Sequence, residues 1–191
     1  MSVTSFSSND FAGTSLVLVG SGIKFVAQLT IEAQTYLKQS PHVLYLLNEP
    51  AMEEWVKSVN PHATSLQAWY EKFPSRADSY AAITQAILDK LTAVQQLCVL
   101  VYGHPTVLAQ SGLAAAKLAH AAGAEVKVLP GISAIDCLFA DLMVDPGRAG
   151  CQFFEATDLL VYQRSVNPSQ HLVLWQAGVI GMWGYYDEHD N

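Results

Sequence analysis

The chain has 191 residues, of which 51% are hydrophobic and 14% are charged, and its formal net charge is −7. A chain of this length and composition buries a core, so extensive disorder is excluded. The ten Lys and Arg residues are scattered in an acidic chain and form no basic patch, so we expect no nucleic-acid partner.

The cysteines and the N-terminal residues indicate in which cellular compartment the protein is expected. Cys98, Cys137 and Cys151 lack CxxC spacing, which favours reduced structural thiols in a cytoplasmic protein and no metal site. Residues 1–14 are polar, with neither a basic start nor an apolar run, so we predict a flexible N-terminal arm. No apolar segment reaches the roughly 20 residues of a membrane helix, and we expect no membrane partner.

Short apolar runs alternate with helical patterns along most of the chain. We predict strands at 15–20, 42–47, 97–102 and 125–130. We predict helices at 26–40, from Pro50, from about Arg76 after an irregular loop, at 108–122 and at 132–143. Continuously apolar strands separated by helices are typical of an α/β fold with a mostly parallel sheet covered on both faces.

The alternation is interrupted by the polar, glycine-rich segment at 144–152 and restarts with a strand at 171–176. We therefore expect a first α/β domain over 15–129 and the start of a second, apparently truncated α/β domain over 130–191. Ligands of parallel sheets bind outside the carboxyl ends of the strands. The segments at that edge are 20–22, 48–49, 102–105 and 130–133, and a glycine turn such as 20–22 taken alone is most often only structural.

Three of these edge segments contain glycine and are informative when they are considered together. VGSG at 19–22, YGHPTV at 102–107 and LPGISA at 129–134 follow in that order. Together they resemble the S-adenosylmethionine-dependent tetrapyrrole methylase superfamily, which carries a Gly-rich turn, a G-D-P-G type loop and P-G-[IV]-S-[SA] ahead of a helix. The resemblance implies that fold, S-adenosylmethionine as cofactor and S-adenosylhomocysteine as product.

Within the superfamily the chain more closely resembles the borosin-type peptide α-N-methyltransferases, which carry YGHPGV in this loop and make ribosomally synthesised, modified peptides. Thr106 stands where their glycine is usual. Their Y-x5-R-x3-Y motif is matched by Tyr70, Arg76 and Tyr80. Their PGISAEDCLFADL-x2-DP motif is matched at 130–146, with Ile135 in place of Glu. The resemblance extends from about 15 to 181 and implies methylation of backbone amides.

An amide nitrogen is a poor nucleophile, so its methylation requires removal of the proton and stabilisation of the resulting imidate. Arg76 and Tyr80 lie four residues apart at the start of a helix and leave the same face, and a phenol beside a guanidinium ionises more readily. Taken alone, this pattern fits a core tyrosine and a surface arginine better. The resemblance assigns catalysis to Tyr70 on the preceding loop, Arg76, Tyr80 and Tyr102.

The resemblance also implies a cofactor site and a partner. Its expected members are Tyr102, Gly103, His104, Pro105, Val107, Ser133, Ala134 and Gln176. The chain ends at Asn191, some tens of residues short of the family pattern, and lacks a precursor segment. We therefore expect a precursor peptide supplied in trans and a homodimer or a hetero-oligomer with the precursor.

Two other functions stay open at this point. A non-catalytic, peptide-binding partner that has lost part of the cofactor pocket would account for the short second domain, although it has no need of all four Tyr and Arg residues. Methylation of a tetrapyrrole such as a precorrin is the other alternative. The YGHP loop and the acidic balance of the chain disfavour it, because a large anionic macrocycle is better served by a basic cleft.

Overall fold

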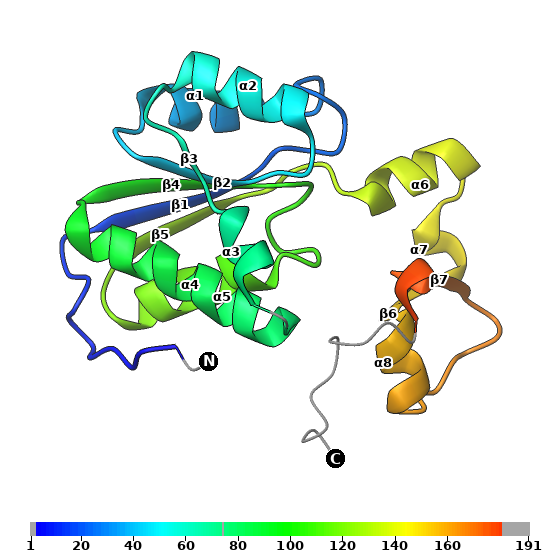
Figure 1. The fold of residues 1–191 in the computed structure, drawn as a ribbon. Coiled ribbons are helices and arrows are strands. Elements are labelled where there is room, and N and C mark those ends of the chain that lie inside the picture. Colours follow the sequence, from blue (N-terminus) through cyan, green and yellow to red (C-terminus); the bar gives the residue numbers. More distant parts are fainter. Residues whose placement is uncertain (1–2, 74, 181–191) are drawn as a thin grey trace. The chain divides into compact units, whose positions relative to one another are not determined.

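The structure is a computed structural model that describes residues 3–73 and 75–180 (Figure 1). The chain divides after Ala134 into two compact units, residues 1–134 (unit 1) and 135–191 (unit 2). This division lies close to the boundary expected at 129/130. No helix in the described ranges is long and apolar enough to cross a membrane.

Unit 1 contains a five-stranded sheet in the order β3-β2-β4-β1-β5, and every pair of neighbouring strands is parallel. The central strands β1 and β4 pair over their full length, from Ser15 opposite Gln96 to Gly20 opposite Val101. Their carboxyl ends therefore meet at one edge of the sheet. The strands are β1 Ser15–Gly20, β2 Val43–Leu46, β3 Thr64–Ser65, β4 Gln96–Val101 and β5 Glu125–Leu129.

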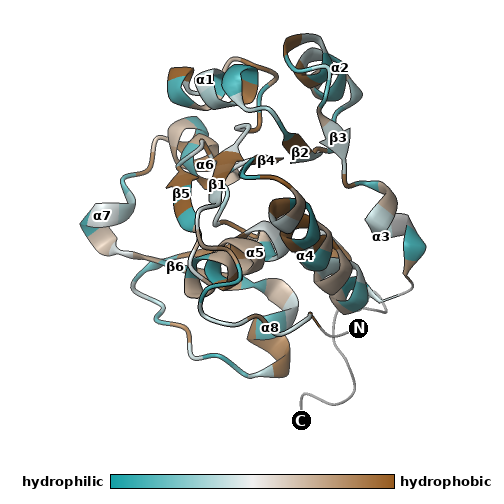
Figure 2. Cartoon of the chain, turned by 90° about the vertical axis from the view of Figure 1, so that its left-hand side faces the viewer, coloured by the Kyte–Doolittle hydropathy of each residue, from teal (hydrophilic) through white to brown (hydrophobic). Residues whose placement is uncertain are grey.

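Helices cover both faces of this sheet (Figure 1). One apolar layer lies between the sheet and helices α1 and α2, and the other lies between the sheet and helices α4 and α5. Strands β1, β2 and β4 are drawn mainly as hydrophobic, whereas β5 and α4 carry both hydrophobic and hydrophilic residues (Figure 2). This is the expected mostly parallel α/β architecture. The helices are α1 Ile31–Gln39, α2 Pro50–Val59, α3 Ala68–Lys72, α4 Arg76–Ala93 and α5 Gln110–Ala121.

Local capping sets where the helices begin. The Ser75 side chain accepts a hydrogen bond from the N–H of Asp78, so α4 starts at Arg76, as expected. The Thr30 side chain caps α1 in the same way through the N–H of Ala33. The helix predicted over 26–40 is therefore confined to Ile31–Gln39, because the residues before Thr30 form the loop that follows β1.

The N-terminal segment differs from the flexible arm that its polar composition suggested. Phe11 is completely buried, and its N–H donates to the carbonyl of Ala122 at 2.9 Å. Its ring lies 4.9 Å from that of Phe6, and the N–H of Thr4 donates to Oε1 of Gln85 on α4 at 2.8 Å. Two aromatic side chains thus anchor residues 3–14 to the core of unit 1.

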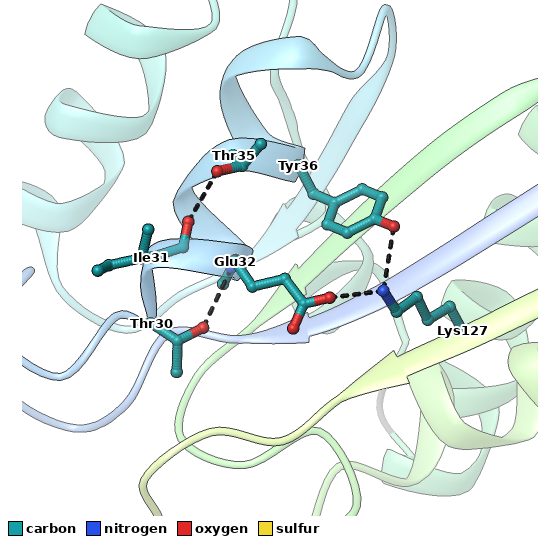
Figure 3. A network of polar contacts seen from close by, with 7 residues as sticks. Thr30, Ile31, Glu32, Thr35, Tyr36 and Lys127 are labelled. Carbon is teal, nitrogen blue, oxygen red and sulfur yellow. Dashed lines mark hydrogen bonds and ion pairs between the residues drawn. The ribbon is translucent and has the colours of Figure 1, made fainter.

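The edge strand β5 carries a charge that reaches across to α1. Nζ of Lys127 lies 2.5 Å from Oε1 of Glu32 and donates to the hydroxyl of Tyr36 at 3.2 Å (Figure 3). These contacts raise the pKa of Lys127, chiefly through the hydrogen bond to Glu32. A lysine on an edge strand also discourages pairing with another chain.

Unit 2 contains two parallel strands, β6 Cys151–Glu155 and β7 His171–Trp175, which pair from Cys151 opposite His171 onward. Its other elements are α6 Ala134–Leu142, whose first residue belongs to unit 1, α7 Pro146–Ala149, α8 Ala156–Val161 and a 3₁₀ turn at Ala177–Val179. Strand β6 and helices α7 and α8 lie in the region that the sequence pattern left without predicted elements.

Candidate functional site

Backbone contacts join the loops at the carboxyl edge of the unit 1 sheet. Gly22 and Gly103 form an antiparallel bridge in which each N–H donates to the other's carbonyl at 3.1 Å. The buried Ser21 hydroxyl, between the two loops, accepts from the N–H of Gly103 at 3.3 Å. The loops after β1 and β4 are therefore held in one fixed arrangement.

Glycines allow these loops to touch. A Cβ on Gly20 would collide with the carbonyl oxygen of Gly103 and lie 2.9 Å from Cδ of Pro105. A Cβ on Gly131, in the loop after β5, would lie 2.7 Å from the same carbonyl oxygen. Gly103 itself has a positive φ of 73°, which favours glycine. The structure thus brings together the three glycine-containing segments that the sequence singled out.

The loop after β4 closes in a tight turn. The N–H of Val107 donates to the carbonyl of His104 at 3.1 Å, and Pro105 occupies the position where β-turns favour proline. The N–H of Thr106 donates to Nδ1 of His104 at 3.2 Å, and the Thr106 hydroxyl lies 3.0 Å from the same nitrogen. The His104 ring is therefore fixed to its own turn.

Two of the expected catalytic tyrosines meet directly. The rings of Tyr70 and Tyr80 are 5.9 Å apart at an interplanar angle of 89°, an edge-to-face pair, and both residues are half-buried. Tyr70 lies on the short helix α3 and not on the predicted loop, because residues 68–72 form a helical turn that packs against α4. Arg76 is exposed at the first position of α4, one turn before Tyr80.

Tyr102 follows β4 and is 42% exposed. It lines a narrow pocket with a volume of about 10 Å³, enough for about one water molecule. The loop after β1 contributes Lys24 and Phe25 to this pocket, and the β2–α2 connection contributes Asn48 and Glu49. None of these four residues was predicted as a site residue. Asn48 and Glu49 could have been identified from the sequence, because they directly follow a strand at the ligand-binding edge of the sheet.

The remaining expected cofactor residues lie at the end of unit 1 and in unit 2. Ser133 is 3% exposed, and Ala134 is the exposed first residue of α6. Gln176 follows β7 in unit 2 and has a left-handed backbone with a φ of 55°. All the expected cofactor residues other than Gln176 therefore belong to unit 1.

The residues of unit 1 fit the amino-acid part of S-adenosylmethionine, which the resemblance implies. A sulfonium is attracted to the face of an aromatic ring, and the exposed ring of Tyr102 provides one. The glycine backbone beside it leaves room where side chains would collide with the neighbouring loops. His104 supplies a polar ring at the same edge.

The described residues form no metal-binding cluster, and the thiol of Cys98 lies in the core. No group of three or more His, Cys, Asp or Glu side chains within 3–73 and 75–180 is arranged to hold a metal ion. Burial raises the pKa of the Cys98 thiol to about 12, so that thiol stays protonated in the core. A shielded, protonated thiol is an inert structural group.

Comparisons with known proteins identify the family of the chain. Residues 15–179 match the sequence profile of the Tetrapyrrole (Corrin/Porphyrin) Methylases. The chain is 39% identical, over 167 residues, to a methyltransferase/ribosomally synthesized type III borosin cyclic peptide precursor of Anomoporia bombycina, covering 87% of this chain and 19% of that protein. The chain spans less than half the length of such relatives, for example 40% of the dendrothelin A precursor of Dendrothele bispora.

Solved structures share the fold. Uroporphyrin-III-C-methyltransferase from Thermus thermophilus aligns with a TM-score of 0.61 at 20% identity, covering 85% of this chain and 68% of that chain.

Proposed function

The chain belongs to the tetrapyrrole (corrin/porphyrin) methylases, and from this premise we propose that it is an S-adenosylmethionine-dependent methyltransferase acting on backbone amides of a peptide. The observation that carries the proposal is the edge-to-face pair of Tyr70 and Tyr80 at the start of α4. The pair belongs to the motif that the chain shares with borosin methyltransferases.

The proposed chemistry divides between the cofactor and the chain. S-adenosylmethionine supplies an electrophilic methyl group on a sulfonium. Tyr80 removes the amide proton, and the Arg76 guanidinium, one helical turn away, supplies positive charge on the same side of α4. Tyr70 donates its hydroxyl to the peptide carbonyl, where negative charge develops as the proton leaves. Tyr102 holds the same amide from the end of β4.

Several features support a peptide in preference to a tetrapyrrole. The borosin relatives are named as peptide precursors as well as methyltransferases. The chain carries a net charge of −7, which suits an anionic macrocycle poorly. A half-buried tyrosine pair has no evident use in methylating an activated carbon. We propose a precursor peptide as the partner, bound by a homodimer of the chain or in a hetero-oligomer with the precursor.

The test is mass spectrometry of a peptide encoded beside the gene, after co-expression with the chain. We expect successive mass increases of one methylene each, and fragmentation should locate the methyl groups on backbone nitrogens. An unmodified peptide, or methyl groups on side chains only, would contradict the proposal.

The role of Tyr80 is tested separately by Tyr80→Phe. We expect loss of methylation with unchanged affinity for S-adenosylhomocysteine in calorimetry, because only the proton acceptor is removed. Tyr36→Phe is the control, since Tyr36 is a half-buried tyrosine on α1 that contacts Lys127 and should leave methylation intact. Unchanged turnover by Tyr80→Phe would exclude Tyr80 as the base, and failure of the unmodified chain to bind S-adenosylhomocysteine would favour a non-catalytic partner.

A further inference from the structure

Thr84 is a polar residue on the buried face of α4. It lies one helical turn after Tyr80 and is 2% exposed. Its hydroxyl donates to the carbonyl oxygen of Tyr80 at 2.8 Å and lies 3.2 Å from the carbonyl oxygen of Ser111 on α5. The single hydroxyl proton therefore faces two backbone acceptors that belong to different helices.

The contact with Ser111 exceeds what the burial of a threonine requires. A threonine inside a helix can satisfy its hydroxyl by donating to the carbonyl four residues earlier. Thr35 on α1 does this by donating to the carbonyl of Ile31 at 2.9 Å (Figure 3). Thr84 makes the same bond and also approaches a carbonyl 27 residues further along the chain. The second contact therefore links two helices.

This link has a direction that the surrounding apolar contacts lack. Farther along α4 the buried residues are Ile87, Leu88 and Leu91, and α5 buries alanines in the same core. Apolar contacts are not directional, so they hold the helices together without fixing the position of one along the other. A hydrogen bond has a narrow range of distance and angle. The Thr84 hydroxyl therefore fixes the turn of α4 that carries Tyr80 against the first turn of α5.

The first turn of α5 is in turn packed against the strand that leads to Tyr102. A Cβ on Gly112 would lie 3.4 Å from Cγ1 of Val101, so the α5 backbone lies against the end of β4. Val101 is the last residue of β4, and Tyr102 follows it directly. Contacts through Thr84 and Gly112 therefore connect Tyr80 to Tyr102, two expected catalytic residues on elements that are separate in sequence.

We propose that Thr84 is a positioning residue for methyl transfer: its hydroxyl holds the α4 turn that carries Tyr80 on α5 and so sets the separation of Tyr80 from Tyr102. This inference rests on the proposed function for the roles of the two tyrosines. A base must lie within hydrogen-bond distance of the proton that it removes, so a small displacement of the turn lowers the rate. Thr84 acts through Tyr80, because it is itself buried between helices.

The link is tested first without substrate, by ¹⁹F spectra of the chain labelled with 3-fluorotyrosine and assigned with Tyr80→Phe. Thr84→Val keeps the shape of the side chain and removes the hydroxyl, so it should displace or broaden the Tyr80 signal. Thr84→Ser keeps a hydroxyl and should preserve that signal. Thr35→Val is the control, because it removes a hydroxyl that bonds within α1. A Tyr80 signal of unchanged position and width in Thr84→Val would overturn the proposal.

The rate of methylation is then measured with the peptide encoded beside the gene. Thr84→Val should lower kcat at least about tenfold, the effect of one hydrogen bond, and leave KM for the peptide and for S-adenosylmethionine within about twofold. Thr84→Ser should restore kcat to within about twofold of the unmodified chain, and Thr35→Val should not change it. Both Thr84 variants should bind S-adenosylhomocysteine like the unmodified chain in calorimetry, because the residue does not touch the cofactor.

The outcomes separate this inference from the proposed function. Equal kcat values of Thr84→Val and Thr84→Ser would overturn the positioning role even if the peptide is methylated, and so would a raised KM with unchanged kcat. The expected ¹⁹F spectra with an unmethylated peptide would support the positioning of Tyr80 and contradict the peptide substrate. If Thr84→Val does not fold, Thr84→Ala replaces it, and an alanine variant as fast as Thr84→Ser would overturn the proposal.

Discussion

The two units of the chain differ in how much apolar surface they bury. Unit 1 has an apolar layer on each face of its sheet, with completely buried residues such as Ile83, Leu88 and Leu100. Within residues 135–180 the one side chain classed as buried is Ala156. Unit 2 instead exposes apolar residues, among them Met143 at 91% and Leu160 at 59%. Unit 1 therefore has its own hydrophobic core, and residues 135–180 of unit 2 form no comparable core.

The difference in buried apolar surface suggests a different role for each unit. Apolar residues of α6 and β7, including Leu138, Phe139 and Leu174, line a pocket of about 290 Å³ within unit 2. An exposed apolar surface of this kind marks an interaction site or a surface that is covered in the assembled protein. The expected catalytic residues lie on α3, on α4 and in the loop after β4, all of which belong to unit 1. Precise placement is thus expected in unit 1 and adaptability in unit 2.

The largest expected effect compares equal truncations in the two units. Leu88→Ala removes a completely buried side chain from the core of unit 1 and should cost about 2–5 kcal/mol of unfolding free energy. Leu160→Ala removes an exposed side chain from α8 and should change it by no more than about 0.5 kcal/mol. Denaturant titration measures both, and similar losses would show that unit 2 has a core comparable to that of unit 1.

The next effect concerns the glycine contacts. Gly131→Ala places a Cβ 2.7 Å from the carbonyl oxygen of Gly103, so neighbouring backbone must shift, at a cost of about 1–3 kcal/mol. Gly178→Ala, in unit 2, meets no atom within 4 Å and should be close to neutral. Thermal melts of the two variants make the comparison. A stable Gly131→Ala protein that still binds S-adenosylhomocysteine would contradict the requirement for glycine in this loop.

The smallest effect is a pH dependence from Cys98. Burial raises the pKa of its thiol from 9.0 to about 12 in the folded chain. The unfolded thiol therefore loses its proton first, so the contribution is fully present below pH 9 and is lost as the pH rises toward 12. The loss is about 1.4 kcal/mol per pH unit in this range. Unfolding curves between pH 8 and 10 should show a shallower decline for Cys98→Ala, whereas Leu100→Ala, on the same strand, should keep the original slope.

The parts of the fold that were predictable depend on contacts close in sequence. The apolar runs of β1 and β4 and the Ser75 cap of α4 are local signals, and the structure agrees with them. Phe11 was missed because its burial depends on Ala122, more than a hundred residues away. A polar segment with two anchoring aromatic residues resembles a flexible arm until the distant residues that contact them are known.

In the candidate site, too, some features were predictable from the sequence and others depend on contacts that only the structure shows. The order of VGSG, YGHPTV and LPGISA indicated which loops meet, and the structure joins them through Gly20, Gly103 and Gly131. The meeting of Tyr70 with Tyr80 required the short helix α3, which the irregular composition of residues 65–75 concealed. The hydrogen bond from the N–H of Thr106 to Nδ1 of His104 fixes the ring to its own turn, and motif matching does not reveal it.

The central claim is that the carboxyl edge of the unit 1 sheet holds the cofactor. Hydrogen exchange measured by mass spectrometry, with and without S-adenosylhomocysteine, tests it most directly. The account predicts slower exchange at 102–108 and 131–134 when the compound is present, with little change at 95–97 and 122–125, at the opposite edge of the same sheet. Protection confined to that opposite edge, or no change at 102–108 under saturating compound, would contradict it.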